Sequence, residues 1–404
     1  MPEAVIVAIA RSPIGRAIKG SLADMRPDDL AVQMVRAALE KVPALDPSSV
    51  VDLMVGCGQP GGEQGFNLGR NVAIQLGYDA IPGTTVTRYC ASSLQTSRMA
   101  MHAIRAGEGD AFISAGVETV SRFHKGESDS LPDTQNPIYQ EAQNKTEERS
   151  SSNKPWTDPR SDGNLPDAYI SMGETAENVA TLAGITRDEQ DQWALRSQMR
   201  TATAIRNGHY AHEITPVQLY DGTTVTADDS PRPGTTMDKL SALPPVFRAG
   251  GTVTAGNACP LNDGAAALVI MSDTRARELG ITPLARIVAT SVTGISPEIM
   301  GLGPVEATKR VLDTAGMTLS DIDLTEINEA FASQVLACSR ALDLDENTLN
   351  VSGGALALGH PFGMTGARIT ASLLNNLTAH DREIGLETMC VGGGQGMAMI
   401  LERL

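Results

Sequence analysis

The stretch Thr84-Thr85-Val86-Thr87-Arg88-Tyr89-Cys90 is followed directly by a helical run over residues 91–106. Its β-branched residues favour an extended strand, so the sequence predicts a strand that ends in a cysteine at the start of a helix. Unpaired backbone N–H groups and the positive end of the helix dipole favour the thiolate at such a position, and the thiolate is the nucleophilic form of cysteine. A small buried core cysteine is the alternative interpretation of Cys90.

The chain uses one strand–helix pattern twice. A strand, a helix and a second strand are expected over residues 5–10, 28–41 and 49–55, and again over residues 285–291, 304–315 and 320–326. Two later pairs of strands also correspond, namely 84–87 before Cys90 with 348–352 before His360, and 111–116 with 388–393. Alternating strands and helices predict an α/β protein. We expect two similar βαβαβ-type halves, with mixed sheets covered by helices, in which Cys90 and His360 face each other.

The region between the two halves interrupts this pattern. Residues 126–167 are rich in Ser, Asn, Asp, Pro and Glu, so a packed core is not expected there. Amphipathic helices are predicted over residues 173–183 and 186–207, and the second begins with a capping box of Thr186 and Glu189. The sequence therefore predicts three parts, which are an N-terminal half at 1–120 with 251–275, an inserted loop domain at 121–250, and a C-terminal half at 276–404.

The 404-residue chain is acidic, with 32 Lys and Arg residues against 48 Asp and Glu residues and a formal net charge of -16. This charge and an aromatic content of 3% argue against nucleic acid as a ligand. No apolar run approaches the roughly 20 residues of a membrane span, so no membrane association is expected. An acidic protein that binds an acidic ligand must gather its positive charge locally.

The five cysteines are odd in number and contain no Cys-x-x-Cys pair. They fit neither a disulfide framework nor a zinc site, so we expect free thiols, no metal and a reducing, cytoplasmic location. Cys57 and Cys338 have no motif around them and are predicted to be buried core residues. The histidines other than His360 are predicted to be structural or exposed, and they are His102, His124, His209, His212 and His380.

Three segments of the second half carry further reactive groups. They are Asn328-Glu329-Ala330-Phe331, Gly353-Gly354-Ala355-Leu356-Ala357-Leu358-Gly359-His360-Pro361 and Cys390-Val391-Gly392-Gly393-Gly394-Gln395-Gly396. With Arg11-Ser12-Pro13-Ile14-Gly15 and the Cys90 segment, they make the chain resemble the thiolase family nearly from end to end. Thiolases are CoA-dependent acyltransferases that make or break a carbon–carbon bond between acyl units. The resemblance implies a duplicated thiolase-like fold and the activity of an acetyl-CoA C-acyltransferase or C-acetyltransferase.

The resemblance also implies a role for each reactive group. Cys90 is the acylated nucleophile, His360 activates it, and Cys390 exchanges the proton at the α-carbon. The Gly392 N–H joins the Cys90 N–H around the acyl-enzyme oxygen, while His360 and a water held by Asn328 surround the thioester oxygen of the other acyl-CoA. The reaction cleaves a 3-ketoacyl-CoA to acetyl-CoA and a shortened acyl-CoA, or condenses two acetyl-CoA to acetoacetyl-CoA. A plain tight turn is the alternative interpretation of residues 392–394.

The CoA site is implied in part. CoA or acetyl-CoA is then a substrate, and no permanently bound cofactor is expected. The implied contacts are Arg232 at the nucleotide end, Ala255, Gly256, Ala258 and Cys259 in a pantetheine loop, and Met172, Phe247, Met300 and Phe331 along an apolar tunnel. Arg232 lies in a stretch with Lys239 and Arg248, and a solvated surface charge is an equally good interpretation of it.

Four residues depart from the family pattern. Thr87 stands where Asn or Asp is usual, Ser93 stands where Gly is usual, and Ser171 stands where a histidine often precedes the methionine. Cys259 replaces the serine that ends the pantetheine loop, which turns a hydrogen bond into a weak one. Because all the core reactive groups are present, these departures affect substrate preference and rate more than reaction class.

Two alternative functions share this kind of fold. A ketoacyl-synthase-like condensing enzyme decarboxylates malonyl units with two histidines, whereas this chain has Asn328 and Cys390 at the corresponding places. A catalytically silent thiolase-like protein that binds acyl-CoA would be favoured by a missing Cys90, His360 or Cys390, and none is missing. The resemblance further implies a homo-oligomer, either a dimer or a tetramer of dimers, with a role in fatty acid β-oxidation. A β-oxidation partner subunit, the acyl chain length and the direction of the reaction are left open.

Overall fold

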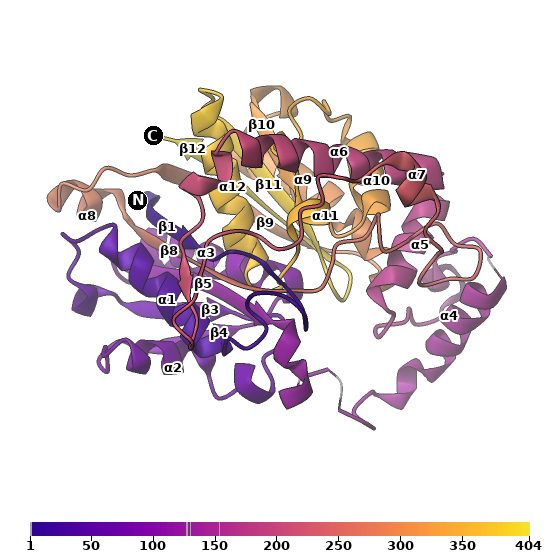
Figure 1. Ribbon diagram of the computed structural model, residues 1–404, viewed down its shortest axis with the longest axis horizontal. Helices are drawn as coiled ribbons and strands as arrows, with labels where there is room; N and C mark the ends of the chain where they lie inside the picture. The colour runs from indigo at the N-terminus through magenta and orange to yellow at the C-terminus, as the bar shows by residue number, and fades with distance from the viewer. Residues whose placement is uncertain (1, 127, 130, 153) are drawn as a thin grey trace.

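The computed structural model describes residues 2–126, 128–129, 131–152 and 154–404, and a mixed β-sheet forms its frame (Figure 1). Within those residues, ten strands join in the order β10-β11-β12-β9-β1-β8-β5-β3-β4, with β2 paired to β8 beside this path. The strands of this sheet are β1 (Ala4–Arg11), β2 (Gly15–Arg16), β3 (Asp52–Gly56), β4 (Gly83–Val86), β5 (Ala111–Thr119), β8 (Asn262–Ser272), β9 (Ala285–Gly294), β10 (Leu324–Ile327), β11 (Ile384–Val391) and β12 (Gln395–Arg403). A separate pair consists of β6 (Val217–Gln218) and β7 (Thr224–Val225).

Helices connect most of these strands. They are α1 (Pro27–Glu40), α2 (Leu68–Gln75), α3 (Ser92–Ala106), α4 (Gln140–Ser152), α5 (Met172–Leu182), α6 (Arg187–Arg206), α7 (Met237–Ser241), α8 (Asp273–Glu278), α9 (Gly303–Ala315), α10 (Ala332–Leu342), α11 (Ala355–Leu358) and α12 (Thr365–Ala379). Short 3-10 turns include η3 (Tyr89–Ala91), which precedes α3, and η7 (His209–His212), which follows α6.

The strand order contains the predicted duplication. The first half runs β4-β3-β5-β8-β1, and the second half runs β10-β11-β12-β9 in the mirrored sense. In each half parallel pairs come first and antiparallel pairs follow. The halves join where β1 pairs with β9, at Val5 with Arg286 and Ile6 with Ala285. The predicted duplicated α/β architecture is therefore confirmed, with the sheets of the two halves joined edge to edge.

One predicted strand is wrong. Residues 348–352, expected to match the strand before Cys90, form no regular strand, and Leu349 makes a single parallel bridge to Thr325 of β10. This bridge lies beside β10 as β4 lies beside β3, so the duplication places the segment correctly. Asn350 adopts a left-handed φ of 47°, which ends the extended conformation after one bridge.

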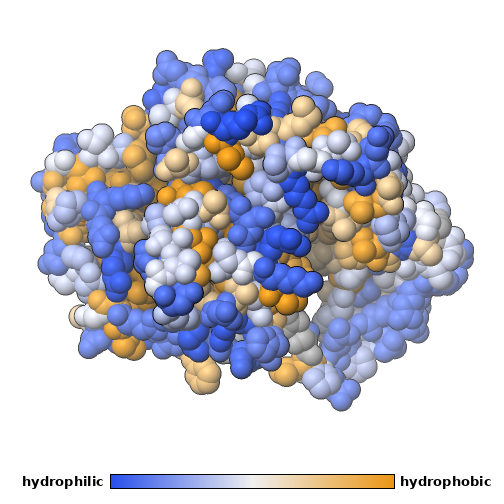
Figure 2. Space-filling model, viewed as in Figure 1, coloured by the Kyte–Doolittle hydropathy of each residue, from blue (hydrophilic) through white to orange (hydrophobic). Residues whose placement is uncertain are grey.

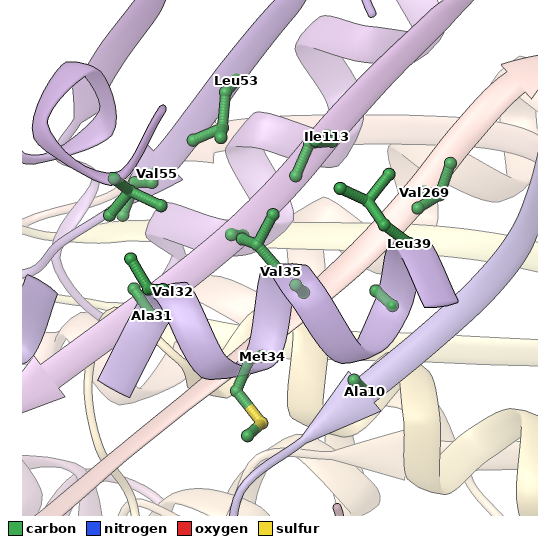
Figure 3. Packing of buried hydrophobic residues seen from close by; sticks show 14 of the residues in the cluster. Ala10, Ala31, Val32, Met34, Val35, Leu39, Leu53, Val55, Ile113 and Val269 are labelled. Atoms are coloured by element: carbon green, nitrogen blue, oxygen red, sulfur yellow. The ribbon is translucent and has the colours of Figure 1, made fainter. Parts of the chain in front are cut away.

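Helix α1 covers one face of the first half. Pro27 in its first turn is compatible with a helix start, and Asp28 and Asp29 complement the positive end of the helix dipole. Apolar residues at helical spacing face the sheet, and Figure 3 shows them against β1, β3, β5 and β8; the labelled residues are Ala10, Ala31, Val32, Met34, Val35, Leu39, Leu53, Val55, Ile113 and Val269. Truncating such a buried side chain to alanine typically costs about 2–5 kcal/mol, so this layer anchors the frame.

Helices α3 and α12 form a layer that both halves share. They pack against each other, and their apolar residues belong to one buried cluster with residues of β1, β8, β9, β11 and β12. Figure 1 shows these two helices between the halves. Helix α9 packs on β9 and β12 of the second half. Helix α3 follows the Cys90 segment, and helix α12 follows the His360 segment. This layer therefore places the start of α3 near the start of α12.

The segment between the halves is helical as well as looped. Helix α4 lies in the stretch where no packed core was expected, and only Ala142 and Thr146 of its described residues are buried. Figure 2 shows mostly hydrophilic residues over α4, at the lower right of the viewed face. The predicted capping box at the start of α6 is confirmed, since the Thr186 N–H donates to Glu189 at 2.7 Å and the Glu189 N–H donates to Thr186 Oγ1 at 3.3 Å. The three-part division of the chain stays a prediction.

Candidate active site

Cys90 lies in a tight turn between β4 and α3. The regular helix begins at Ser92, so one 3-10 turn separates the thiol from the expected helix start. Tyr89 adopts a left-handed φ of 41°, a conformation that is costly for a residue with a side chain. Ser92 holds this turn, because its hydroxyl accepts from the Arg88 N–H at 2.9 Å and donates to the Tyr89 carbonyl at 2.6 Å. The strained turn fixes where the Cys90 side chain is presented.

The glycine-rich turn after β11 contacts the Cys90 thiol. Gly394 has a φ of 78°, and a Cβ atom there would lie 2.3 Å from the Ile295 carbonyl oxygen, so only glycine fits. The turn directs the Gly392 N–H at the Cys90 sulfur, and the N–H of Cys90 itself also stabilises a charge there. The structure thus brings together the two backbone donors that the sequence predicted at this position.

The protonation states differ from those expected. Burial raises the pKa of Cys90 to about 11, which outweighs the lowering by the N–H groups of Gly392 and Cys90. Burial, followed by the positive charge of Arg368, lowers the pKa of His360 to about 3. The prediction of a resting thiolate is therefore wrong, because desolvation exceeds the effect of the helix start. At neutral pH Cys90 is a thiol and His360 is a neutral imidazole.

His360 is held in one orientation by a hydroxyl group. Its backbone N–H donates to Asn262 Oδ1 at 2.9 Å, and its Nδ1 lies 2.6 Å from Thr365 Oγ1. The Thr365 hydroxyl already donates to the Pro361 carbonyl at 2.7 Å, so it accepts from His360 Nδ1–H. The Nε2 atom of the neutral ring therefore carries the lone pair. A buried imidazole whose Nε2 carries a lone pair can take a proton.

Asn328 follows β10 and lies against the same ring. Its Nδ2 is 3.4 Å from His360 Nε2, and its Oδ1 accepts from Arg368 Nη2 at 3.3 Å. The Asn328 backbone N–H donates to Thr388 of β11 at 3.0 Å. These contacts fix the amide with its N–H side toward the imidazole, so a small donor lies beside the proton acceptor.

Cys390, near the end of β11, is fully buried. It shares a small apolar cluster with Met172, Met300 and Phe331, three of the four predicted tunnel residues. The fourth, Phe247, contacts Phe331 edge to face with ring centroids 6.2 Å apart. Burial first, and then a negative charge on Cys90, Cys338 or Cys259, raise the pKa of Cys390 well above its usual range. Cys390 is therefore a protonated thiol within electrostatic reach of Cys90.

A cavity of about 350 Å³ opens beside the predicted pantetheine loop. Its lining includes the predicted residues Arg232, Ala255, Gly256 and Ala258, and also Lys239. Neither Arg232 nor Lys239 pairs with a carboxylate of the described residues, so both charges are available to an anion. Arg248, from the same stretch, is buried and contacts Glu174 at 2.6 Å, which removes it from this cavity.

The four departures have identifiable contacts. Thr87 donates to the Gly58 carbonyl at 3.1 Å, and Ser171 caps α5 by accepting from the Glu174 N–H at 3.4 Å. The Ser93 hydroxyl accepts from the Ala367 N–H at 2.9 Å and so links the first turns of α3 and α12. Cys259 does not line the 350 Å³ cavity, and burial and the nearby Cys90 raise its pKa to about 12.

Sequence reasoning missed two residues that hold the site. Thr365 orients His360, and nothing in a single sequence distinguishes its hydroxyl from others at a helix start. Glu118, at the end of β5, is buried and accepts from the N–H groups of Gly58 at 2.7 Å and Gly363 at 2.8 Å. It thereby links loops from the two halves. The sequence marks it only as an acidic residue in a strand whose other side chains are uncharged.

Comparison with known proteins tests the family assignment. Residues 4–274 match the family described as "Thiolase, N-terminal domain", and residues 281–403 match "Thiolase, C-terminal domain".

The chain belongs to the thiolase family.

Several relatives match this thiolase over its whole length. It is 40% identical to a 3-ketoacyl-CoA thiolase of Bacillus subtilis and 43% identical to a 3-oxoadipyl-CoA/3-oxo-5,6-dehydrosuberyl-CoA thiolase of Escherichia coli, with 100% of each chain covered. The crystal structure of the dimeric peroxisomal thiolase of Saccharomyces cerevisiae matches with a TM-score of 0.88 and 32% identity, over 100% of this chain and 98% of that one. These matches confirm the predicted thiolase family and the acyltransferase class. They also confirm the predicted function, which is thiolase acyl transfer with CoA. They favour it over a ketoacyl-synthase-like enzyme and over a catalytically silent protein.

Two further features concern ligands and location. Among the described residues, no cluster of three or more His, Cys, Asp or Glu side chains is arranged to hold a metal ion. In the same part of the chain, every helix is too short or too polar to cross a membrane.

Proposed function

We propose that Cys90 carries the acyl group and that this thiolase cleaves 3-ketoacyl-CoA with CoA, the reverse reaction being condensation of two acetyl-CoA. The observation that supports it most is the pair of N–H groups, from Gly392 and Cys90, at a buried thiol. Donors fixed in advance around a reacting carbonyl stabilise the oxyanion that develops on it, and each is typically worth about 10²–10³ in kcat.

The proton transfers follow from the two neutral groups. His360 Nε2 takes the Cys90 proton as the sulfur attacks the 3-keto carbon. The bond to the α-carbon then breaks, and Cys390 donates its proton to the acetyl-CoA carbanion. CoA attacks the resulting acyl-enzyme and gives its thiol proton to Cys390, while Cys90 leaves and recovers its proton from His360. The cycle returns every group to its starting state, and a positioned acid or base of this kind contributes about 10²–10⁴-fold.

A second set of donors serves the other carbonyl. His360 and Asn328, 3.4 Å apart at Nε2 and Nδ2, would face the thioester oxygen of the acyl-CoA whose α-carbon reacts. Arg368 orients the Asn328 amide from behind. We expect an Asn328→Ala variant to slow carbon–carbon bond formation and cleavage more than acylation of Cys90 by acetyl-CoA.

CoA would occupy the cavity at the 254–259 loop. Arg232 and Lys239 supply positive charge in an otherwise acidic protein, and the apolar residues Met172, Phe247, Met300 and Phe331 lead toward Cys390. An Arg232→Gln variant should raise the KM for CoA about three- to tenfold with little change in kcat, because an exposed ion pair contributes about 1 kcal/mol. Arg277→Gln, which removes an exposed arginine outside the cavity, is the matched control. An equal KM in both variants would contradict this placement of CoA.

The substrate is a 3-ketoacyl-CoA of the fatty acid β-oxidation type, with no permanently bound cofactor. A relative named 3-ketoacyl-CoA thiolase supports this class, whereas another is named 3-oxoadipyl-CoA/3-oxo-5,6-dehydrosuberyl-CoA thiolase. Steady-state thiolysis of acetoacetyl-CoA, longer 3-ketoacyl-CoAs and 3-oxoadipyl-CoA separates these substrates. Preference for 3-oxoadipyl-CoA would contradict the β-oxidation assignment, and absence of turnover with all of them would contradict the function.

The chain would work as a homo-oligomer built on the β4 edge. Strand β4 ends the sheet with partly exposed residues, and the nearby Phe66 side chain is 91% exposed. An open strand edge with an exposed aromatic residue favours pairing with another chain, and a yeast relative is described as dimeric. Light scattering should show a dimer or a tetramer of dimers, and Phe66→Asp should shift it toward the monomer. A cytoplasmic location belongs to the same proposal, and fractionation tests it. Copurification tests whether a β-oxidation partner subunit binds this chain.

A further inference from the structure

A second and larger cleft lies away from the 350 Å³ cavity. It has a volume of about 1400 Å³ and is bounded by β1, the C-terminal end of α6, η7 and α12. Arg403, at the end of β12, forms part of its rim, near the chain end marked C in Figure 1. Among the described residues that line it, none is a predicted catalytic or CoA-contacting residue.

The lining of this cleft is rich in basic residues, although the whole molecule is acidic. The whole chain has 48 acidic against 32 basic side chains, yet the described lining contains one acidic side chain, that of Glu213. Glu213 is already bound by Arg11 at 3.2 Å. The cationic or protonatable residues of the lining are Lys41, Arg200, Arg403, His209, His212 and His380, three of them among the six histidines of the chain. Neither Lys41 nor Arg200 pairs with a carboxylate of the described residues. Arg403 contacts Asp381 at 3.0 Å, and His209 lies 3.8 Å from Glu213. An anion would therefore meet two cations, Lys41 and Arg200, that have no acidic partner among the described residues.

The rest of the lining is largely apolar. Ile9, Val351, Met199 and Leu284 belong to it, and the last two are 61% and 43% exposed. Apolar side chains beside unpaired cations suit a ligand that has both an apolar body and a negative group. A bare inorganic anion would leave the apolar part of the cleft in water.

Polar groups at the floor are held in place. The Ser352 hydroxyl donates to Asn376 at 2.5 Å and lies 3.2 Å from His209 Nε2, and the Tyr210 hydroxyl donates to the Ser352 carbonyl at 2.6 Å. The Asn375 amide lies 3.1 Å from the same His209 nitrogen. A fixed floor limits the conformational entropy that is lost when a ligand binds.

We infer that this cleft binds an amphipathic organic anion, with an apolar chain against Met199 and Leu284 and a carboxylate or phosphate group between Lys41, Arg200 and the histidines. This inference goes beyond the proposed acyl transfer and does not depend on it. The ligand is defined by its chemistry, because a free fatty acid and a phosphorylated lipid share the same two features.

His209 makes the binding dependent on pH. Burial lowers the pKa of His209, the facing carboxylate of Glu213 opposes this, and His380 and His212 lower it further. A bound anion adds a negative charge beside His209 and so favours its protonated form. Binding should tighten as the pH falls from 8 to 6.

Calorimetric titration of the full chain, saturated with CoA so that the acyl site is filled, tests the inference. The probes are dodecyl phosphate and dodecanoate below their micelle concentrations, with dodecanol and inorganic phosphate as comparisons. The double variant Lys41→Gln/His212→Gln should bind the anionic probes about tenfold more weakly, since an exposed charge and an exposed imidazole contact are lost. The double variant His102→Gln/Lys309→Gln removes the same residue types elsewhere and should bind like the wild type.

The outcomes separate clearly. Binding of either anionic probe that weakens only in the cleft variant supports the inference, and the tighter probe identifies the head group. Equal binding of dodecanol or of inorganic phosphate would overturn it, because the ligand would then need only one of the two features. Equal affinity in the cleft and control variants would also overturn it. Thiolysis activity should be unchanged in both variants, which keeps this test independent of the catalytic proposal.

Discussion

Replacing Thr365 with valine should disable the proton acceptor of the site while keeping its shape. Valine has nearly the same volume as threonine but no hydroxyl. In the wild type this buried hydroxyl accepts from His360 Nδ1–H at 2.6 Å and donates to the Pro361 carbonyl at 2.7 Å. Without it the Nδ1–H is left without a partner, or the proton moves to Nε2 and occupies the lone pair that would take the Cys90 proton in the proposed mechanism.

The size of the effect follows from the cost of a buried unpaired donor. That cost is about 1–3 kcal/mol, and about 1.4 kcal/mol corresponds to tenfold in rate. If the proton moves to Nε2, the unpaired donor is avoided, but His360 then has no lone pair with which to accept a proton. In either case acylation of Cys90 should slow by about 5- to 150-fold. The lost hydrogen bond to Pro361 should lower the free energy of unfolding by about 1 kcal/mol, which leaves the protein folded.

Single-turnover acetylation by acetyl-CoA, followed by rapid quench, measures the step directly. Thr365→Ser keeps the hydroxyl and should restore most of the rate. In a His360→Asn background, Thr365→Val should have no further effect on acetylation, because both changes act through the same imidazole. Additive losses in the double variant, or equal rates in the valine and serine variants, would refute the assignment of Thr365 as a positioning residue.

Three further outcomes follow from the same geometry. Cys390→Ala should still accept an acetyl group on Cys90 but lose about 10²–10⁴-fold in thiolysis and condensation, and unchanged steady-state turnover would exclude the role of Cys390. Alkylation of Cys90 by iodoacetamide should keep rising between pH 7 and 9.5, because burial raises its pKa to about 11, and a plateau below pH 8 would indicate a resting thiolate. Burial raises the pKa of Glu326 to about 8, above its unfolded value, so its contribution to stability is complete at low pH and is lost as the pH rises through about 8. Urea midpoints should therefore fall from pH 5.5 to 7.5 in the wild type and fall less in Glu326→Gln, while identical slopes would contradict that pKa.

The frame of the fold could be predicted from local patterns. Strand β1, helix α1 and helix α9 agree with their predicted positions to within a residue or two at most of their ends, because their apolar residues repeat at the spacing that each structure requires. The strand predicted over residues 348–352 is wrong because the left-handed conformation of Asn350 ends it after one bridge. The duplication still placed this segment beside β10, so comparison of the halves was more informative than the strand pattern.

The electrostatics of the site could not be predicted from neighbours in sequence. Cys90 was expected to ionise because of the helix that follows it, but its pKa depends on burial by residues of both halves. Thr365 and Glu118 act across the fold, and the contact from Glu118 to the Gly363 N–H spans 245 positions. Motif order supplied the candidate reacting groups, whereas their protonation states depend on packing that no single segment contains.

The most direct test of the account is the location of the acyl group. Wild-type protein is incubated with acetyl-CoA, quenched in acid, digested and analysed by mass spectrometry, with Cys90→Ser and Cys390→Ala treated in parallel. We predict one acetyl group on the peptide that contains Cys90 in the wild type and in Cys390→Ala, and none in Cys90→Ser. An acetyl group on Cys390 or Cys259, or a labelled Cys90→Ser protein, would contradict it.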